Sequence, residues 1–288
     1  MGAAPGRRNQ SCYGGVGSSR DEIMTMRCAG IDIGSRAIKL VVVENGTIVE
    51  QCQTDTGYDP MAAARKLLQG VPYERILATG YGRGQFEVDF DAPTVTEIKA
   101  HAAGARYFFP EACTVLDIGG QDSKAIAMNA SGRVVKFEMN DRCAAGTGKF
   151  LEIMAKSLGF SSEQFAAEAL EADKDIQINS MCTVFAESEV SSLVARGEDR
   201  RNIAMGLHKS VVRRAAGMLR RVSGEGPVVF SGGVAKNRCM LKLMEETLQQ
   251  PIWTAEDPQM TGALGAALLA GREGADSGMA NGYSARER

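Results

Sequence analysis

The residues from Asn140 to Glu152, NDRCAAGTGKFLE, place a cysteine ahead of a glycine-rich turn that runs into an amphipathic helical pattern. A helix N-terminus presents free N–H groups and the positive end of the helix dipole, so a cysteine there is favoured as a thiolate. The segment is not a P-loop, because the first glycine of that motif would fall on Cys143 and Phe150 stands where Ser or Thr must bind magnesium. We therefore expect a thiolate at Cys143, at or near the start of a helix.

A second cysteine, Cys182, directly precedes another predicted helix, which ends at Gly197. Its apolar residues are expected on one face: Val184, Phe185, Val190, Leu193 and Val194. Two thiolates do not complete a [4Fe–4S] site, which needs four. A symmetric homodimer would supply two from each subunit, with the cluster on the two-fold axis. The alternatives are two buried thiols or a labile zinc site.

The other cysteines indicate no further metal site. The chain has seven cysteines without CxxC pairs, and it shows no signal peptide, so we expect a reducing cytoplasm and no disulfide framework. Cys12 lies in the N-terminal leader, and the remaining four are interpreted as small buried apolar residues: Cys28, Cys52, Cys113 and Cys239.

An internal repeat of the pattern D-I-G-x-x-x-x-K, at a spacing of about 85 residues, predicts a duplicated two-lobed architecture. Its copies are Asp32, Gly34 and Lys39, then Asp117, Gly119 and Lys124. Each opens a strand–turn–strand segment whose glycine exposes backbone N–H groups for an anion, and an aspartate there can hold magnesium or its waters. Two facing hairpins would bind a nucleoside triphosphate between the lobes; the alternative is an ordinary hairpin in each place.

Between the copies lie a predicted helix at 60–68, a strand at 75–79 and a helix beginning near Thr96. Glu97 has two interpretations: it positions the water that attacks the terminal phosphate, or it pairs with the helix dipole. His101 and His208 are interpreted as helix residues that are packed or face solvent, because neither has a ligand-like neighbour at i+4.

The remaining elements are a strand-like stretch DIQINS before Cys182, a long helix at 200–222, a strand at 227–233, a helix at 240–248, a strand at 252–255 and a last helix at 261–271. The pair Gly232-Gly233 after a buried strand would let the backbone approach a flat ligand such as adenosine. Small residues in the last helix predict close packing, among them Gly262, Ala263 and Gly265.

Bulk composition excludes several classes of function. The formal net charge of the 288 residues is −2 without a basic block, and no apolar run has the length of a membrane span, so neither nucleic acid nor a membrane is an expected partner. We expect a disordered leader at 1–26, with Met24 or Met26 as a possible true start. Lobes follow at 27–110 and 111–271, and a disordered tail at 272–288.

The order DIGS, DIGGQD, SGGVAKN resembles the phosphate-1, phosphate-2 and adenosine elements of the acetate and sugar kinase, Hsp70 and actin superfamily. Within it, the segments ATGYGR, TEIKAHA, NDRCAAGTGKFLE and MCTVFAESEV resemble the activator (component A) of 2-hydroxyacyl-CoA dehydratases and the ATPase subunits of benzoyl-CoA reductase, the BadF/BadG/BcrA/BcrD type. The resemblance covers about residues 28–271. It implies an α/β, duplicated, actin-like (ribonuclease H-like) ATPase fold with nucleotide between the lobes.

The resemblance also implies ATP, Mg²⁺ and one [4Fe–4S] cluster bridging a homodimer through Cys143 and Cys182 of each chain. The implied catalytic residues are Asp32, Glu97, Asp117 and Gln121. The implied nucleotide-binding residues are Gly34, Ser35, Lys39, Gly119, Gly120, Gln121, Gly232, Gly233 and Lys236. The expected function is ATP-driven transfer of a low-potential electron, received from ferredoxin or flavodoxin, to a dehydratase or acyl-CoA reductase partner.

Two other classes of function fit part of the pattern: a small-molecule kinase with structural cysteines, and a non-catalytic nucleotide-binding regulator. A kinase needs a substrate pocket in the insert between the hairpins and the adenosine motif, and the cysteine segments occupy that insert. The acyl-CoA substrate, the cluster potential, the electron donor and the extent of nucleotide-driven motion have no signature in the sequence.

Overall fold

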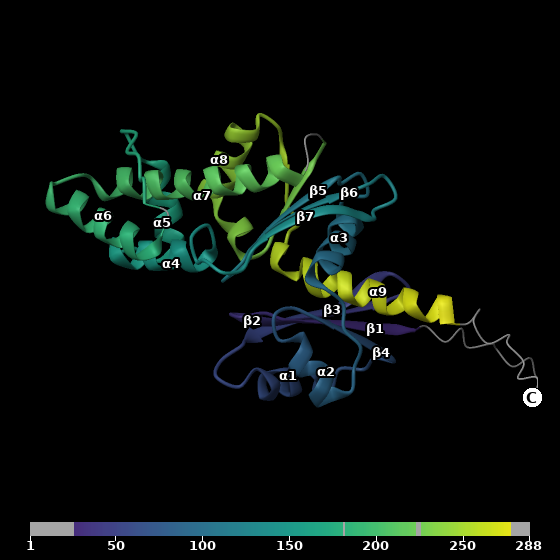
Figure 1. The fold of residues 1–288 in the computed structure, drawn as a ribbon. Coiled ribbons are helices and arrows are strands. Elements are labelled where there is room, and N and C mark those ends of the chain that lie inside the picture. Colours follow the sequence, from purple (N-terminus) through teal and green to yellow (C-terminus); the bar gives the residue numbers. More distant parts are fainter. Residues whose placement is uncertain (1–25, 181, 223–225, 278–288) are drawn as a thin grey trace, which may run out of the picture.

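The computed structural model describes residues 26–180, 182–222 and 226–277 (Figure 1). Two β-sheets lie on either side of a pair of helices, and further helices cover their outer faces. The predicted leader, except for Met26, and the end of the predicted tail lie outside the described residues. No helix in the described ranges has both the length and the apolar character to cross a membrane.

The first sheet has the strand order β3-β2-β1-β4. Its strands are β1 (Arg27–Ile33), β2 (Ala37–Glu44), β3 (Thr47–Asp55) and β4 (Arg75–Thr79). The first three form antiparallel pairs through the predicted turns, and β4 lies parallel to β1. β1 and β2 are mostly buried because helices cover both faces of this sheet, which explains their nearly continuous apolar sequence.

The second sheet has the order β7-β6-β5-β8-β9. Its strands are β5 (Thr114–Ile118), β6 (Ser123–Met128), β7 (Val134–Asn140), β8 (Val228–Ser231) and β9 (Ile252–Trp253). β5, β6 and β7 are antiparallel, whereas β8 is parallel to β5 and β9 is parallel to β8. β9 is shorter than the strand predicted at 252–255.

The two sheets repeat each other down to the strand register. Asp32 pairs with Lys39 across the first hairpin, and Asp117 pairs with Lys124 across the second. Both sheets also have a register irregularity at the same place in the repeat, at Val42/Val43 and at Ala127/Met128. The repeated sequence pattern therefore corresponds to a repeated structural unit.

Two helices separate the sheets. α9 (Thr261–Ser277) packs on β1, β2 and β4 of the first sheet, and α3 (Glu97–Phe108) packs on the second sheet (Figure 1). α1 (Pro60–Leu68) and α2 (Arg83–Phe90) cover the outer face of the first sheet. The last helix therefore returns to the first lobe, and it continues past Gly271, where the sequence pattern places its end.

Glycines bring the backbones of these inner elements into direct contact. A methyl group on Gly104 of α3 would lie 2.0 Å from the carbonyl oxygen of Thr261, and one on Gly265 of α9 would lie 1.7 Å from that of Ala100. Gly30 does the same for β1, since a methyl group there would lie 2.1 Å from a carbonyl oxygen of α9. The close packing predicted for the last helix is confirmed, and it joins the two lobes without intervening side chains.

The outer face of the second sheet carries the rest of the helices. α7 (Arg200–Val222) and α8 (Arg238–Leu248) pack near the sheet, and α4 (Gly148–Ser157), α5 (Ser162–Leu170) and α6 (Thr183–Ala195) extend beyond it (Figure 1). One large apolar core, which includes Phe150, Phe165 and Phe230, runs from the sheet into these helices.

Two local predictions are wrong. The stretch DIQINS (175–180) pairs with no strand in the described part of the chain. Its backbone is bonded to side chains of two helices instead: Arg213 of α7 donates to the carbonyl oxygen of Ile178, and Glu189 of α6 accepts from the amides of Asn179 and Ser180. On α6, Val190 is buried and Leu193 partly so, but Val184 and Phe185 are each 67% exposed. The expected single apolar face is thus split between the core and the surface.

Candidate functional site

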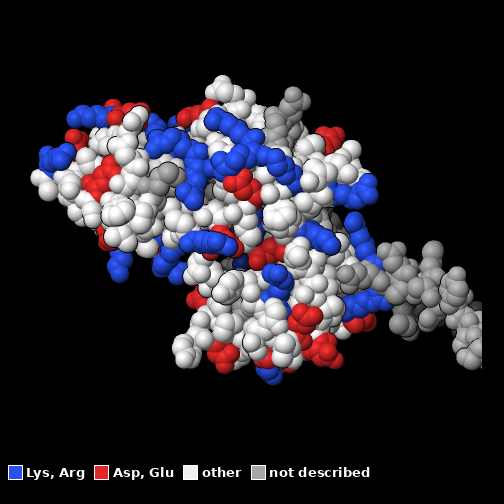
Figure 2. Space-filling model, viewed as in Figure 1, with Lys and Arg blue, Asp and Glu red and all other residues white. Residues whose placement is uncertain are grey.

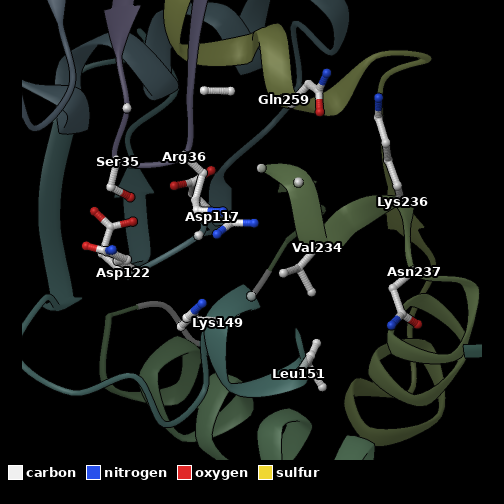
Figure 3. Close-up of a pocket in the computed structure, with 18 of the residues that line it drawn as sticks. Ser35, Arg36, Asp117, Asp122, Lys149, Leu151, Val234, Lys236, Asn237 and Gln259 are labelled. Atoms are coloured by element: carbon white, nitrogen blue, oxygen red, sulfur yellow. The ribbon is translucent and has the colours of Figure 1, made fainter. Parts of the chain in front are cut away.

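A cavity of about 1340 Å³ lies between the two hairpins of the repeat and the helices behind them (Figure 3). Every residue predicted to contact nucleotide lines it: Asp32, Gly34, Ser35, Lys39, Glu97, Asp117, Gly119, Gly120, Gln121, Gly232, Gly233 and Lys236. The volume exceeds the usual upper range of about 1000 Å³ for small-ligand sites, so a nucleoside triphosphate has ample room. Figure 2 shows acidic and basic atoms close together at the depression between the lobes.

The two aspartates of the repeat sit at equivalent points of the two hairpins, each beside the lysine of its own copy. Lys39 Nζ lies 3.0 Å from Asp32 Oδ2, and Lys124 Nζ lies 3.2 Å from Asp117 Oδ2. Both carboxylates are buried. A buried carboxylate needs a cation or hydrogen-bond donors, and the lysine of each copy supplies the cation.

In each lobe, the same pair of residue types, a hydroxyl residue and then a glycine, lies at the end of the strand parallel to the hairpin. This pair was not recognised from the sequence as part of the repeat. Thr79 ends β4 beside Asp32 and is followed by Gly80, whereas Ser231 ends β8 beside Asp117 and is followed by Gly232. Both glycines have positive φ, and a methyl group would lie 2.4 Å from Asp32 Oδ1 at Gly80 and 2.8 Å from Asp117 Oδ1 at Gly232. The signal was present in the sequences ATG and FSG, each after an apolar strand.

Lys124 is the most heavily paired group in the site, and its side chain is only 2% exposed. Its ammonium lies 2.7 Å from Glu97, 2.7 Å from Asp122 and 3.2 Å from Asp117. Burial alone would lower its pKa, but the charges of Asp117, Glu97 and Asp122 raise that pKa well above its ordinary value. Lys124 therefore remains a cation at any physiological pH.

The environment of Asp117 favours its ionised form. Burial raises the pKa of this carboxyl, but the charges of His101 and Lys124, with hydrogen bonds from Lys124 and Ser231, lower the pKa to about 2. Asp122 differs, because burial dominates there and raises its pKa. Asp117 is thus available as an anionic ligand, and no sequence pattern indicated that Asp122 belongs to this cluster.

Glu97 has an ion-pair partner besides the helix terminus and the phosphate that its two predicted roles involve. It is the first residue of α3, after the N-cap Thr96, so the helix-terminal placement is as expected. Its carboxylate, however, is paired with the buried Lys124 at 2.7 Å. The arrangement fixes Glu97 at the wall of the cavity by an ion pair that the sequence pattern did not indicate.

The chemistry of these groups fits a divalent cation that arrives with phosphate. Four carboxylates (Asp32, Glu97, Asp117, Asp122) surround two ammonium groups (Lys39, Lys124), which leaves an excess of negative charge at the hairpins. Within the described ranges, no three His, Cys, Asp or Glu side chains form a ready metal cage. Magnesium suits such a place, because it binds through one or two carboxylates with phosphate oxygens and water.

Both histidines are packed, and both contact the site. His101 Nδ1 lies 3.5 Å from Asp117 Oδ1 and 3.4 Å from Ser231 Oγ. Burial lowers the pKa of His208 to about 4, so its ring is neutral at pH 7. One ring nitrogen of His208 lies 2.8 Å from the carbonyl oxygen of Ala204 and the other 3.0 Å from Asn237, which caps α8 at the edge of the cavity.

The tips of the two hairpins meet, and α4 is joined to them. A methyl group on Gly120 would lie 2.5 Å from Arg36 Cγ of the opposite hairpin. The amides of Gly148 and Lys149, at the start of α4, donate to the carbonyl oxygens of Gly119 and Gly120 at 2.9 and 2.8 Å. The backbone of the second hairpin is therefore continuous, through hydrogen bonds, with the first turn of α4.

Glu152 of α4 holds two cations that face the cavity, one from each lobe. Arg36 Nη2 lies 3.2 Å from Glu152 Oε2, and Lys149 Nζ lies 3.4 Å from Glu152 Oε1. Figure 3 shows Arg36 and Lys149 directed into the cavity together with Ser35. Because all three ionic side chains are more than a third exposed, these ion pairs are weak, and an incoming phosphate can compete for both cations.

Cys143 lies in the loop 141–147, which we name the Cys143 loop. The prediction that it stands at or near a helix start is wrong in detail, because α4 begins at Gly148 with Thr147 as its N-cap. The intervening residues form a turn in which Asn140 Nδ2 donates to the carbonyl oxygens of Cys143 and Ala145 at 2.9 and 3.1 Å. Gly146 has a φ of 85°, which this turn requires.

Cys182 is the N-cap residue of α6, as predicted, and its side chain is exposed. Cys143 is half-buried, and neither cysteine lines the nucleotide-sized cavity. Among the other described cysteines, Cys28 and Cys239 are buried, as expected, and burial raises the pKa of Cys239 to about 12. Cys52 and Cys113 are only half-buried. Cys143 and Cys182 are thus both at least partly accessible, and two thiols are half the donor set of a four-thiolate cluster.

Comparison with known proteins agrees with this site. The model of the BadF/BadG/BcrA/BcrD ATPase family matches residues 29–270. The activator of lactoyl-CoA dehydratase from Anaerotignum propionicum is 43% identical over 254 residues, covering 85% of this chain and 97% of the relative.

Solved structures give the same picture. Component A of (R)-2-hydroxyglutaryl-CoA dehydratase from Acidaminococcus fermentans has a TM-score of 0.81 at 38% identity, covering 87% of this chain and all of the other. The activator of 2-hydroxyisocaproyl-CoA dehydratase from Clostridium difficile, solved with ADPNP, has a TM-score of 0.80 at 36% identity, covering 91% and 100%. More distant sugar kinases share only the fold, which is the expected actin-like ATPase fold.

Proposed function

This chain belongs to the BadF/BadG/BcrA/BcrD ATPase family, and from that premise we propose that it is an ATP-dependent activator of a 2-hydroxyacyl-CoA dehydratase or benzoyl-CoA reductase-type partner. In this proposal ATP hydrolysis drives a low-potential electron from a [4Fe–4S] cluster, bridging two copies of the chain, to the partner. The names of relatives support the partner class, since they include several dehydratase activators and one of the subunits of benzoyl-CoA reductase.

One observation carries the proposal: the nucleotide-sized cavity is connected through backbone hydrogen bonds to the helix that follows the Cys143 loop. The phosphate-type hairpin at Gly119 and Gly120 is hydrogen-bonded to the first turn of α4, and the Cys143 loop directly precedes that turn. A change in the hairpin on binding or loss of the terminal phosphate therefore acts on α4 and on this loop. A two-state element biased by nucleotide is what ATP-driven electron transfer requires.

The residues of the cavity have separate proposed roles. Backbone N–H groups of Gly34, Ser35 and Gly120 would bind the phosphates. Gly119, whose own N–H donates to the carbonyl oxygen of Asp122, would let the backbone approach them, while Asp32 and Asp117 would hold Mg²⁺ directly or through its waters. Gln121 is proposed to orient the attacking water. Lys39 and Lys236 would offset phosphate charge. Mg²⁺, when bound, would neutralise charge that develops on the phosphate oxygens.

Glu97 and the adenosine elements complete the assignment. Because Lys124 holds the Glu97 carboxylate, we place Glu97 at the terminal phosphate as a positioning group. Gly232 and Gly233 are proposed to let the adenosine approach the backbone, with η1 (Gly233–Lys236) and the N-cap Asn237 beside it.

The proposed dimer follows from the donor set. One chain offers two suitable thiols, Cys143 and Cys182, and two copies offer the four that the cluster needs. The exposed Val184 and Phe185 beside Cys182 support a second chain at this place, because a large apolar side chain in the first turn of a helix is stabilised by being covered. When bound, the cluster would supply the low-potential electron, with ferredoxin or flavodoxin as the proposed donor.

An anaerobic absorbance spectrum of the purified protein, recorded before and after air exposure, tests this function. The proposal predicts a broad, oxygen-labile visible band together with magnesium-dependent ATP hydrolysis. The rival function is a small-molecule kinase of the same fold, which predicts colourless, metal-free protein and phosphate transfer to a small acceptor. Colourless protein after anaerobic reconstitution with iron and sulfide would contradict the activator.

A further inference from the structure

One stripe of α7 holds the segment that leads to Cys182. Asn202, which is buried, accepts hydrogen bonds from the amides of Asp173 and Lys174 at 2.9 and 3.1 Å. Further along the helix, a methyl group on Gly206 would lie 2.3 Å from the carbonyl oxygen of Ile176. One turn later, Lys209 lies 2.7 Å from Asp175.

Arg213 ends this stripe, and its Nη2 donates to the carbonyl oxygen of Ile178 at 3.0 Å. The stripe residues Asn202, Gly206, Lys209 and Arg213 recur at the spacing of one helix face. From the other side, the carboxylate of Glu189 on α6 accepts hydrogen bonds from the amides of Asn179 and Ser180. The backbone of 173–180 is thus fixed along its length although it belongs to no sheet.

The neighbouring stripe of α7 holds the Cys143 loop. Arg214 Nη2 donates to Asn140 Oδ1 at 3.4 Å, and the same Asn140 amide group holds the carbonyl oxygens of Cys143 and Ala145. A methyl group on Gly146 would lie 2.7 Å from Arg214 Cδ, so the loop rests directly on this side chain. Two turns later, Arg221 binds Glu138 of β7 through two hydrogen bonds of 2.6 Å each.

We propose that Arg213 and Arg214 are positioning residues that fix two segments relative to each other: the Cys143 loop and residues 173–180, which lead to Cys182. We call these the two cysteine segments. Adjacent residues of one helix point to different sides, so each arginine reaches a different segment from the same rigid turn. α7 is the longest described helix, and much of it is packed in the core, so it cannot bend to follow one segment alone. This inference rests on the proposed function, because the segments need a constant separation only if their two thiolates bind the same cluster.

The arginines act by charge-assisted hydrogen bonds to backbone or amide oxygens. In Figure 2 basic side chains cover the surface over α7, so a positive charge by itself is common on this helix. Arg213 and Arg214 differ from the other basic residues of α7 in what they bind: Arg213 binds the backbone of Ile178, and Arg214 binds the Asn140 amide that holds the Cys143 loop. Lys209 contacts 173–180 only through the side chain of Asp175. Arg220, also exposed on α7, has no hydrogen bond or ion pair with the described residues and serves as the matched control.

The test is hydrogen exchange by mass spectrometry on the full-length, metal-free chain under reducing conditions. Arg214→Gln is expected to raise exchange in residues 141–147 by about threefold to tenfold, with 173–180 unchanged, which is the range for loss of one such hydrogen bond. Arg213→Gln is expected to raise exchange in residues 173–180 by a similar factor, with 141–147 unchanged. Arg220→Gln should leave both segments as in the wild type.

The proposal would be overturned if each glutamine variant exchanged faster than the wild type in both segments, or in neither. Should a glutamine variant not fold, the corresponding Arg→Met variant, which has no donor, takes its place, and wild-type exchange in its segment would equally overturn the proposal. A second experiment measures how fast the visible absorbance band of the anaerobic protein disappears in air. The band should disappear faster in Arg213→Gln and Arg214→Gln than in Arg220→Gln. A wild-type chain that forms no cluster would contradict the proposed function, whereas the exchange data would still decide the positioning.

Discussion

Replacing Lys124 by methionine should destabilise the protein strongly at neutral pH and much less in mild acid. The side chain is buried, and its ammonium is the common partner of Glu97, Asp122 and Asp117 at 2.7, 2.7 and 3.2 Å. Methionine fills a similar volume but leaves the three carboxylates without their cation. Removing one partner of a buried ion pair costs about 3–5 kcal/mol of unfolding free energy.

The cost of protonating one of these carboxyls gives a similar estimate of the lost unfolding free energy. The variant can relieve the repulsion by binding one proton, and doing so at pH 7 on a carboxyl with an ordinary pKa of 3.8 costs about 4 kcal/mol. At pH 5.5 the same protonation costs about 2 kcal/mol. Because the folded variant then carries a proton that the unfolded chain lacks, its stability must fall as pH rises between these values.

The wild type behaves differently in this range. The pKa of Asp117 is lowered to about 2, so its contribution to stability is present above the unfolded value of 3.8 and is lost only as pH falls towards 2. The stability of the wild type should therefore not improve on going from pH 7 to pH 5.5 through this group. The comparison of the two proteins isolates the effect of the lost ammonium.

The assay is urea unfolding at pH 7 and pH 5.5 without nucleotide, followed by fluorescence of the single tryptophan, Trp253, which packs on Phe109. Lys39→Met is the matched control, because Lys39 is the equivalent lysine of the repeat but has only Asp32 as an ion-pair partner among the described residues. It should lose less stability than Lys124→Met. A loss below about 1 kcal/mol for Lys124→Met, or an equal loss at both pH values, would refute the reasoning.

Three further sets of variants test the carboxylates, the cavity cations and the packing of α9. Asp32→Ala and Asp117→Ala should each reduce magnesium-dependent ATP hydrolysis by about a hundredfold or more without lowering iron content, and near-normal hydrolysis would exclude that carboxylate from metal binding. Glu152→Gln frees two cavity cations from weak ion pairs, so calorimetry should show ADPNP binding about twofold to fivefold tighter, whereas weaker binding would contradict the competition. Gly265→Ala should cost about 3 kcal/mol or more in urea unfolding, since its methyl group would lie 1.7 Å from a backbone oxygen, while Gly84→Ala, with open space around it, should cost nothing.

The repeat was the most informative feature of the sequence. Because Asp32 and Asp117 open identical local patterns, the duplicated hairpins and their cavity could be predicted without knowledge of the packing. The partners from distant segments could not. Lys124 pairs with Glu97 across the fold, and nothing in the two local patterns indicates that contact. Ion pairs of this kind depend on how α3 is placed on the second sheet, which is a property of tertiary packing.

Around the cysteines, some of the local structure could be predicted from the sequence and some could not. Cys182 as an N-cap followed from the helical spacing after it, although those apolar residues do not share one face. Cys143 was expected closer to the start of α4 than it is, because Asn140 and Thr147 form a turn that glycine-rich sequence alone does not specify. The stretch 175–180 has alternating apolar residues typical of a strand, yet its backbone is bonded to the side chains of Arg213 on α7 and Glu189 on α6. Local pattern cannot distinguish those two ways of satisfying an extended backbone.

The central claim is that two copies of this chain share one cluster through Cys143 and Cys182. Iron analysis combined with light scattering on anaerobically purified protein tests it most directly. The account predicts a dimer with about four iron atoms for every two chains, and loss of iron in Cys143→Ser and in Cys182→Ser but not in Cys239→Ser. A stable monomer that carries a full cluster, or equal iron loss in all three variants, would contradict it.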